Sequence, residues 1–401
     1  MNRFLRLATH ASLALSMGVV AFGQHYTQVN LVSNTSGVAP VTDPTLINPW
    51  GLSRGSGSPW WISDNGTGLS TLFNGAGTKV PLIVTIPKAD PTSKTFPTGT
   101  PTGTIANGSS TDFLLPGGPA AAFLFSTLDG AIVGWNAAVG IAPGGKAPSV
   151  NGVVVAKTTD GSSYTGLTSA LVKGNRYLYA ANFTKGRVDV YDNAFHRVKL
   201  REQSEGGLLG LLLGFEEEPF TDPFLPRDFV PFNVQAIGNN VVVTFVLHQE
   251  GSPLETDGPG LGYVDIFTSQ GRLVQRLEHV DQLNAPWGVA LAPLDFGRFS
   301  HDLLIGQFAG GGTTEGSGTI AAYDLVTGKF KGLLQDAGGQ PVAINGLWAI
   351  TPANGATASS YDPAGSPAGE LYFTAGPNKG AGGLFGYLKP VATELTEGND
   401  Q

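Results

Sequence analysis

Short runs of alternating hydrophobic and polar residues, separated by glycine-containing turns, recur along the chain from about residue 26 to residue 388. Alternation with a period of two is typical of half-buried β-strands, and Asn-Gly or Asp-Gly pairs between such runs indicate hairpin turns. The clearest runs are residues 60–63, 177–181, 187–191, 241–247, 263–267 and 370–374. The pattern predicts an all-β protein.

A repeated motif organises these strands, and its best copy is Asn-Pro-Trp-Gly-Leu-Ser at residues 48–53. The repeats are anchored at Gly51, Gly166, Asn233, Gly288 and Gly346, with separations of 115, 67, 55 and 58 residues. The first separation is about two periods long, so we place a hidden copy at residues 107–109, Asn-Gly-Ser. Six copies of this length, each rich in short strands, predict a six-bladed β-propeller.

The N-terminal strand has no blade of its own. Residues 26–32 are β-favouring but precede the first copy, while the sixth copy lacks a clear fourth strand. Because propellers commonly close their ring with one terminus, we expect this strand to complete the last blade. The propeller should span residues 24–388 and be followed by a polar tail at 389–401. Residues 88–104 are rich in Pro, Thr, Gly and Lys, which predicts an exposed loop.

One segment departs from the repeat. Residues 203–224 lie in the longest interval between adjacent anchors, and they contain an apolar, glycine-broken run at 206–215 followed by three glutamates. We expect an inserted loop here. It could pack on its own propeller, cover one face, contact a partner or touch lipid.

The N-terminus resembles a secretory signal peptide. Arg3 and Arg6 precede a mostly apolar stretch at residues 7–22, and small residues precede a plausible cleavage site before Gln24. We therefore predict a signal peptide at residues 1–23 and a secreted or periplasmic protein. The alternative is a retained membrane anchor, for which the apolar stretch is short. No later segment has transmembrane length.

Composition narrows the class of partner. The formal net charge is −8 and the isoelectric point is about 5.2, which argues against nucleic acid because phosphate binding needs a basic surface. The absence of cysteine excludes disulfides and thiolate chemistry. We expect a monomer that binds a protein or a small polar ligand.

Two resemblances support the predicted architecture. The segment Pro-Trp-Gly-Val-Ala-Leu at residues 286–291 resembles the core of NHL-type repeats, whose six-bladed propellers bind proteins and sometimes RNA. The motifs at residues 48–52, 129–136, 181–183 and 285–288 are similar to those of an uncharacterised family of exported bacterial proteins. This resemblance implies a fold and a cellular location but no reaction.

Propellers bind ligands where inner strands and their loops meet the central channel, so polar residues at these positions are candidate ligands. The candidates are Asn48, Asp64, Asn65, Asn182, Asn233, His248, Asn284 and Asn345. A ring of asparagines could bind a polar ligand, bridge waters or hold a Ca²⁺ ion through carbonyl oxygens. Alternatively, each asparagine could serve only to allow left-handed turns and to cap backbone groups.

The enzymatic alternative is a hydrolase of the gluconolactonase or regucalcin type, which resembles this chain in being a six-bladed propeller that holds a divalent metal. The sequence departs from that pattern because Asn48, Asn233 and Asn345 are neutral where carboxylates are expected, leaving Asp64 as the one candidate metal ligand. His248 and Glu250 form the one His–acid pair in a plausible top loop, where they could act in acid–base chemistry.

We therefore expect an exported propeller that acts as a binding or interaction module, with no cofactor. A hydrolase, assisted by a divalent metal such as Ca²⁺, is the alternative. A cell-surface adhesion or matrix component is a third hypothesis.

Overall fold

The computed structural model describes residues 24–95, 97–200, 218–308, 318–353 and 368–394. Regular structure in these residues is almost entirely β-strand, with two short 3-10 turns, Gly297–Phe299 and Ala392–Glu394. No helix of the described residues is long and apolar enough to span a bilayer. The predicted signal peptide (1–23) and the apolar part of the predicted insertion (206–215) lie outside the described residues.

The strands form six mainly antiparallel sheets, which are the blades. Blade one consists of β3 (Pro49–Ser53), β4 (Trp60–Asp64), β5 (Leu69–Phe73) and β6 (Lys79–Thr85); blade two of β7 (Pro101–Ala106), β8 (Phe123–Thr127), β9 (Ala131–Trp135) and β10 (Val153–Lys157); blade three of β11 (Tyr164–Val172), β12 (Asn175–Asn182), β13 (Arg187–Tyr191) and β14 (Arg197–Val198). Blade four consists of β15 (Phe229–Ile237), β16 (Asn240–Leu247), β17 (Gly262–Thr268) and β18 (Leu273–Arg276); blade five of β19 (Pro286–Leu291), β20 (Leu303–Gln307), β21 (Ile320–Tyr323) and β22 (Phe330–Leu333). Blade six combines β23 (Leu347–Pro352), β24 (Leu371–Ala375) and β25 (Leu384–Pro390) with the N-terminal β1 (Tyr26–Ser33) and β2 (Val41–Thr42).

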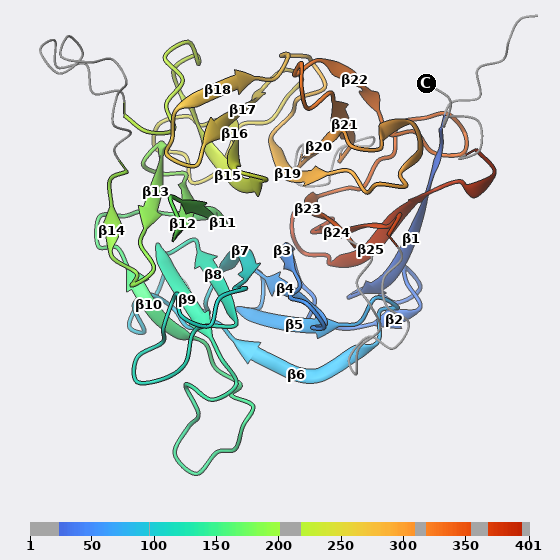
Figure 1. Ribbon diagram of the computed structural model, residues 1–401. Coiled ribbons are helices and arrows are strands. Elements are labelled where there is room, and N and C mark those ends of the chain that lie inside the picture. Colours follow the sequence, from blue (N-terminus) through green and yellow to red (C-terminus); the bar gives the residue numbers. More distant parts are fainter. Residues whose placement is uncertain (1–23, 96, 201–217, 309–317, 354–367, 395–401) are drawn as a thin grey trace, which may run out of the picture.

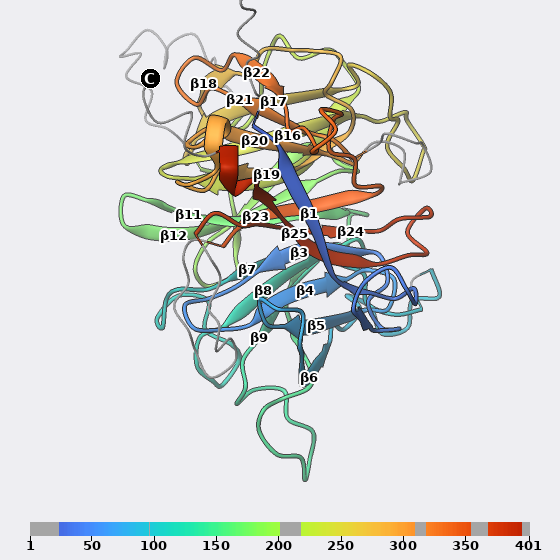
Figure 2. The ribbon, with the colours of Figure 1, turned by 90° about the vertical axis from the view of Figure 1, so that its right-hand side faces the viewer.

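The blades form one closed ring. The inner strands β3, β7, β11, β15, β19 and β23 surround a common axis, and each contacts the next, with β23 contacting β3 (Figure 1). Figure 2 shows the ring from the side, with β1 running along its edge. The predicted six-bladed β-propeller is confirmed. We call the face at which the inner strands begin the top face.

The predicted closure by the N-terminal strand is also confirmed. β1 pairs antiparallel with β25 from Tyr26 opposite Pro390 to Ser33 opposite Leu384, and β2 adds a short parallel fifth strand. The Tyr26 hydroxyl donates a hydrogen bond of 2.8 Å to the Phe296 carbonyl in blade five. The closing strand therefore also contacts the preceding blade. Because β25 extends to Pro390, the predicted polar tail begins inside a strand.

The predicted loop at residues 88–104 is wrong at its C-terminal end. Residues 101–104 begin β7, the inner strand of blade two, and are buried. The hidden repeat is therefore anchored at Gly103 and not at Gly108. In blade six the anchor position belongs to Ala349 rather than Gly346, because Gly288 of blade five packs against the backbone of Trp348 and Ile350.

Small residues at the anchor position allow the inner strands to approach closely. Every inner strand has a register shift near this position. A Cβ atom on Gly51 would lie 2.4 Å from the Thr102 carbonyl oxygen, so only glycine fits there without a backbone shift. The anchors in order are Gly51, Gly103, Gly166, Asn233, Gly288 and Ala349. Asn233 is the one member of this ring with a long polar side chain.

The described end of the predicted insertion packs on the propeller. Phe220 is buried, and its ring centroid lies 5.5 Å from that of Tyr179 in blade three and 5.6 Å from that of Phe267 in blade four. This contact agrees with the interpretation that the segment packs on its own propeller.

Candidate functional site

Aromatic rings close the axis near the top face. Trp348 stacks between Trp50 and Phe308, with ring centroids 3.6 and 3.9 Å away. Trp287 and Phe232 contact the same ring from the side, at 5.6 and 6.0 Å. These rings come from four blades and are buried, so they form a plug rather than an open channel mouth.

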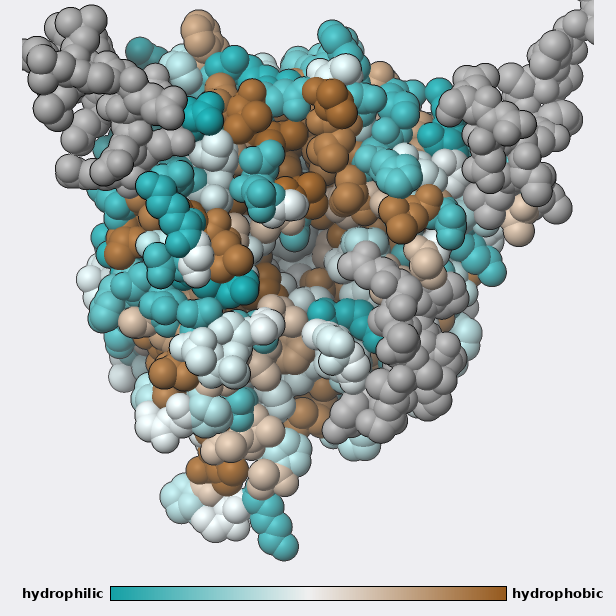
Figure 3. Space-filling view, in the orientation of Figure 1, coloured by the Kyte–Doolittle hydropathy of each residue, from teal (hydrophilic) through white to brown (hydrophobic). Residues whose placement is uncertain are grey.

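Beside this plug the axis contains a small cavity. Its volume is about 30 Å³, and inner-strand residues including Gly103, Asn233, Gln235 and Thr351 line it. The face seen in Figure 3 is hollowed at its centre, where the inner strands converge. A cavity of this size holds a water molecule, whereas small-molecule sites usually measure about 300–1,000 Å³.

Of the predicted candidates, Asn233 lines this cavity and the others do not. Asn233 donates a hydrogen bond of 2.7 Å from Nδ2 to the Trp287 carbonyl of the next blade. Asn48 has a φ of 47° and accepts a hydrogen bond of 3.0 Å from Trp348 Nε1. Asn65 donates to the Pro101 carbonyl at 3.2 Å. These side chains join neighbouring blades through hydrogen bonds.

Asp64 is fully buried and is not one of the residues that line the axial cavity. Its Oδ2 accepts a hydrogen bond of 3.0 Å from the Thr71 backbone N–H, and its Oδ1 has no partner. Burial raises the pKa of the Asp64 carboxyl well above its usual value, which favours the neutral form. No group of three or more His, Asp or Glu side chains in the described part of the chain is arranged to hold a metal.

Three of the remaining predicted residues are Asn284, Asn345 and His248. Asn284 accepts a hydrogen bond of 2.7 Å from the Gly258 N–H and so anchors the long loop of blade four. Asn345 is exposed. His248 is hydrogen-bonded through Nε2 to the Ser252 carbonyl at 2.8 Å, and its ring lies 4.3 Å from that of Phe183.

The predicted Glu250 is exposed, and a second acid of the same loop, Glu255, is partly buried. Burial raises the pKa of Glu255, and His248 acts in the opposite direction. Glu255 could not be found from its spacing to His248, because the loop folds back and pairs Leu247 with Thr256.

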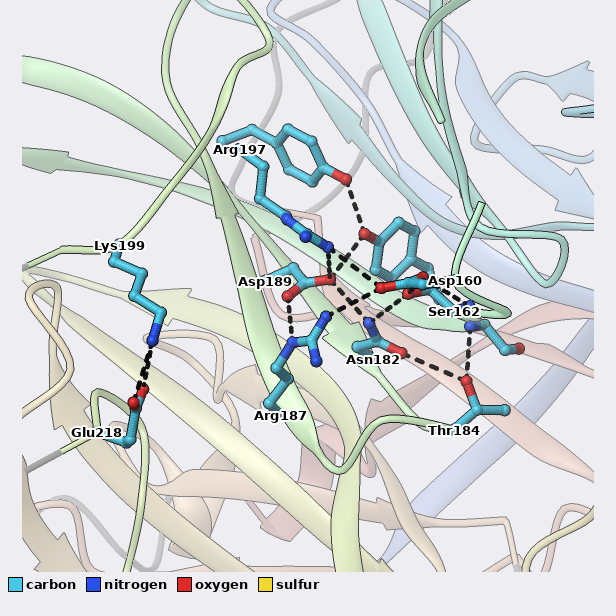
Figure 4. Close-up of polar contacts among 12 residues, drawn as sticks. Asp160, Ser162, Asn182, Thr184, Arg187, Asp189, Arg197, Lys199 and Glu218 are labelled. Atoms are coloured by element: carbon cyan, nitrogen blue, oxygen red, sulfur yellow. Dashed lines mark hydrogen bonds and ion pairs between the residues drawn. The ribbon is translucent and has the colours of Figure 1, made fainter. Parts of the chain in front are cut away.

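A polar cluster of the described residues is centred on Asp189 in β13 (Figure 4). Asp189 is buried and accepts hydrogen bonds from Tyr164 Oη at 2.9 Å, Asn182 Nδ2 at 2.7 Å and Arg187 Nε at 2.7 Å. Arg197 Nη1 lies 3.6 Å from its Oδ2. Asn182 is thus the one predicted residue that belongs to this cluster.

A second layer of contacts extends the cluster to the surface. Asp160 accepts a hydrogen bond from the Ser162 hydroxyl at 2.5 Å and lies 3.5 Å from Arg187 Nη2 and 3.6 Å from Arg197 Nη1. The Ser162 hydrogen bond, followed by a backbone hydrogen bond and nearby cations, lowers the pKa of Asp160 to about 2. Asp160 is therefore ionised at neutral pH.

A hydrogen-bonded pair of tyrosines connects the buried carboxylate to a groove. Tyr164 Oη and Tyr191 Oη lie 2.7 Å apart, and burial raises the pKa of both hydroxyls, so both remain neutral. Tyr191 lines a groove of about 460 Å³ between the outer strands of blades two and three. The other lining residues are Ala156, Lys157, Thr158, Thr159, Asp160, Phe195, His196 and Arg197. This groove has the size and the polar groups of a small-molecule site.

No protein-family model matches the chain. It is 28% identical over 359 residues to uncharacterized protein R648 of Acanthamoeba polyphaga mimivirus, covering 89% of this chain and 78% of that protein. It is also 28% identical over 362 residues to uncharacterized protein L690 of the same virus, covering 89% of this chain and 84% of that protein. These relatives are viral, so the comparisons do not support the bacterial family or the NHL-like repeats expected from the motifs.

Among solved structures, the chain resembles a structural genomics protein of unknown function from Bacteroides thetaiotaomicron. The TM-score is 0.50 at 10% identity, covering 92% of this chain and 76% of that one. A likeness at this identity concerns the fold alone. A gluconolactonase from Xanthomonas campestris overlaps with a TM-score of 0.33 at 13% identity, covering 67% of this chain and 82% of that one. A likeness this low carries no argument about function.

Proposed function

We propose that this protein is an exported β-propeller binding module, and that the groove between blades two and three receives a small polar ligand. The observation that carries this proposal is the groove itself, with a volume of about 460 Å³ and a lining of charged, hydroxyl and aromatic side chains. The axial cavity, at about 30 Å³, is too small for this role.

The groove is also pre-formed. Arg197 lies 3.6 Å from both Asp160 and Asp189, and Asp189 is itself fixed by Tyr164, Asn182 and Arg187. Side chains that are already ordered lose less conformational entropy on binding, which favours affinity for a small ligand.

Blocking the groove tests this proposal. Thr159 is exposed and lines the groove, so Thr159→Trp should fill it without disturbing the core. Thr35→Trp, at an exposed threonine in blade six, is the matched control. Calorimetric titration with a panel of monosaccharides, sugar acids, sugar phosphates and amino acids should show at least one ligand that binds the native protein. Thr159→Trp should weaken that binding by about tenfold or more, and Thr35→Trp should not. No binding from this panel, or equal effects of the two variants, would contradict the proposal.

Export is a separate part of the proposal and rests on the N-terminal sequence pattern. Protein recovered from outside the cytoplasm should begin at Gln24, as measured by N-terminal sequencing and intact mass. Recovery of the full chain with residues 1–23 attached to membranes would favour the retained anchor instead.

A hydrolase is the second candidate, and the electrostatic interaction of Glu255 with His248 favours it. A carboxyl group whose pKa is raised by burial, beside a histidine, is suited to acid–base catalysis. Purified protein would be assayed on gluconolactone with and without added Ca²⁺, next to Glu255→Gln and Asp64→Asn. Hydrolysis that Glu255→Gln abolishes would support the hydrolase, and an absence of hydrolysis in every sample would exclude this activity on gluconolactone.

A further inference from the structure

Arg197 presents unused hydrogen-bond donors beside the groove. Its Nη1 lies 3.6 Å from Asp160 and from Asp189, while its Nε and Nη2 make no hydrogen bond within the described residues. A guanidinium group fixed on one side by two carboxylates keeps its other donors in a defined orientation. Such donors match the two oxygens of a carboxylate or a phosphate.

The charges that line the groove favour an anion. Lys157 and Arg197 are exposed cations of the lining, and His196 lies beside them with its Nδ1 3.3 Å from the Asp192 carboxylate. Asp160 is the one acid of the lining, and Arg187 Nη2 lies 3.5 Å from its carboxylate. The lining is therefore cationic in a protein whose formal net charge is −8. A local reversal of sign attracts an anion to this groove in preference to the rest of the surface.

The rest of the lining suits a hydroxylated molecule. Thr158 and Thr159 present hydroxyl groups, while Ala156 and Phe195 provide an apolar surface on which the face of a sugar ring can pack. Tyr191 also lines the groove, and its hydroxyl is hydrogen-bonded to that of Tyr164. A ligand with hydroxyl groups and one oxyanion would satisfy both parts of the groove.

We infer that the groove binds an oxyanion, a carboxylate or a phosphate, carried on a hydroxylated molecule of about monosaccharide size, and that Arg197 receives the oxyanion. This inference rests on the proposed binding function and specifies the chemistry of its ligand. The carboxylate and the phosphate share the recognition by Arg197, and separate probes distinguish them.

The test compares three probes: glucuronate, glucose 6-phosphate and glucose. The native protein should bind at least one of the two anionic probes ten times more tightly than glucose. Whichever anion binds identifies the carboxylate or the phosphate as the preferred group. Raising the salt concentration should weaken that binding because the charges are exposed.

Variants connect this preference to Arg197. Arg197→Gln should lose at least tenfold in affinity for the preferred anion, and Arg197→Lys should lose less because it keeps the charge without the planar fork. Lys157→Gln should also weaken binding, and it leaves the contacts of Asp189 intact. This second variant keeps the test valid if Arg197→Gln does not fold. Lys379→Asn removes an exposed cation from blade six, on the opposite side of the ring, and should leave affinity unchanged.

Three outcomes would overturn the inference. Equal binding of glucose and both anions would mean that the groove takes neutral ligands, and the binding function would survive. Equal effects of Arg197→Gln and Lys379→Asn would mean that the anion binds elsewhere. An absence of binding by all three probes would exclude a sugar-sized oxyanion of this class, whereas the binding function itself is decided by the wider panel and Thr159→Trp.

Discussion

Asp189 and Asp265 occupy the same position in consecutive blades: each lies three residues after the turn glycine of its third strand, and each is buried. Their partners differ. Asp189 faces two arginines and accepts further hydrogen bonds from a tyrosine and an asparagine. Asp265 lies opposite Arg276, but Asp222 already accepts both hydrogen bonds from that guanidinium. The arginines therefore compensate a negative charge on Asp189 in blade three, whereas a negative charge on Asp265 in blade four would have no cation of its own.

Asp189→Asn should destabilise the protein. The substitution keeps an acceptor for Tyr164 and Asn182 but removes the charge that faces Arg187 and Arg197. We expect the free energy of unfolding to fall by about 3 kcal/mol, the lower end of the range for breaking a buried ion pair, because both arginines are partly exposed. Urea unfolding at pH 7 measures the change. A change smaller than about 0.5 kcal/mol would contradict the view that the ion pairs of Asp189 with Arg187 and Arg197 stabilise the fold.

Asp265→Asn should make the protein more stable at high pH, whereas Asp189→Asn makes it less stable. Burial, followed by repulsion from Asp222, raises the pKa of Asp265 to about 8. In the unfolded chain an aspartate ionises near pH 4, so between about pH 4 and pH 8 the folded protein holds a proton that the unfolded chain has lost. The stabilising contribution of this proton is complete below about pH 4, falls as pH rises, and is gone above about pH 8.

The measurement is the free energy of unfolding of the native protein and of Asp265→Asn at pH 5.5, 7 and 9. The stability of the variant relative to the native protein should increase from pH 5.5 to pH 9, because asparagine carries no charge to bury. A difference that stays constant across this range would show that Asp265 does not titrate there. Asp189→Asn, measured in parallel, controls for the loss of a buried carboxylate at the equivalent position.

The overall fold could be predicted because its signals are local and repeated. Strand alternation, turn glycines and the period of the anchors are all present in short stretches of sequence, and the unpaired run at residues 26–32 matched the blade that lacked a strand. The inner strand of blade two could not be predicted in this way. Its residues include Thr102 and Thr104, which are buried and satisfied by hydrogen bonds, as when Thr102 Oγ1 donates to the Tyr164 carbonyl at 2.7 Å. A buried strand of threonines has no hydrophobic alternation to detect.

The candidate site was predicted only at Asn182. Polar residues at equivalent strand ends do not converge on the axis, because the aromatic rings of Trp50, Trp287 and Trp348 occupy that place. The cluster around Asp189 instead joins a loop with all four strands of blade three. Its one signal in the sequence is an aspartate between valines in an alternating strand, where a buried charge needs partners.

The anchor position in blade two provides a test with a matched control. A Cβ atom on Gly103 would lie 2.4 Å from the Leu167 backbone nitrogen, while one on Gly108 would meet nothing within 4 Å. Gly103→Ala should therefore lower the free energy of unfolding by about 1–3 kcal/mol, because the neighbouring inner strand must move. Gly108→Ala should change it by less than about 0.5 kcal/mol. Equal effects in thermal or urea unfolding would contradict the assignment of Gly103 to the inner ring.

The aromatic plug should be a major source of stability for the ring. Trp348 is 2% exposed and contacts rings from blades one, four and five, so truncating it removes contacts that hold four blades together. Trp348→Ala should lower the free energy of unfolding by about 3–5 kcal/mol, and Trp348→Phe should cost less because most of the stacking area remains. Val326→Ala, at a residue that is 86% exposed, should change stability little and serves as the control. Unfolding of Trp348→Ala at the same urea concentration as Val326→Ala would contradict this prediction. The inner strands and β1 would then be sufficient to hold the blades together. A role in binding would explain the rings at the axis better than a role in stability.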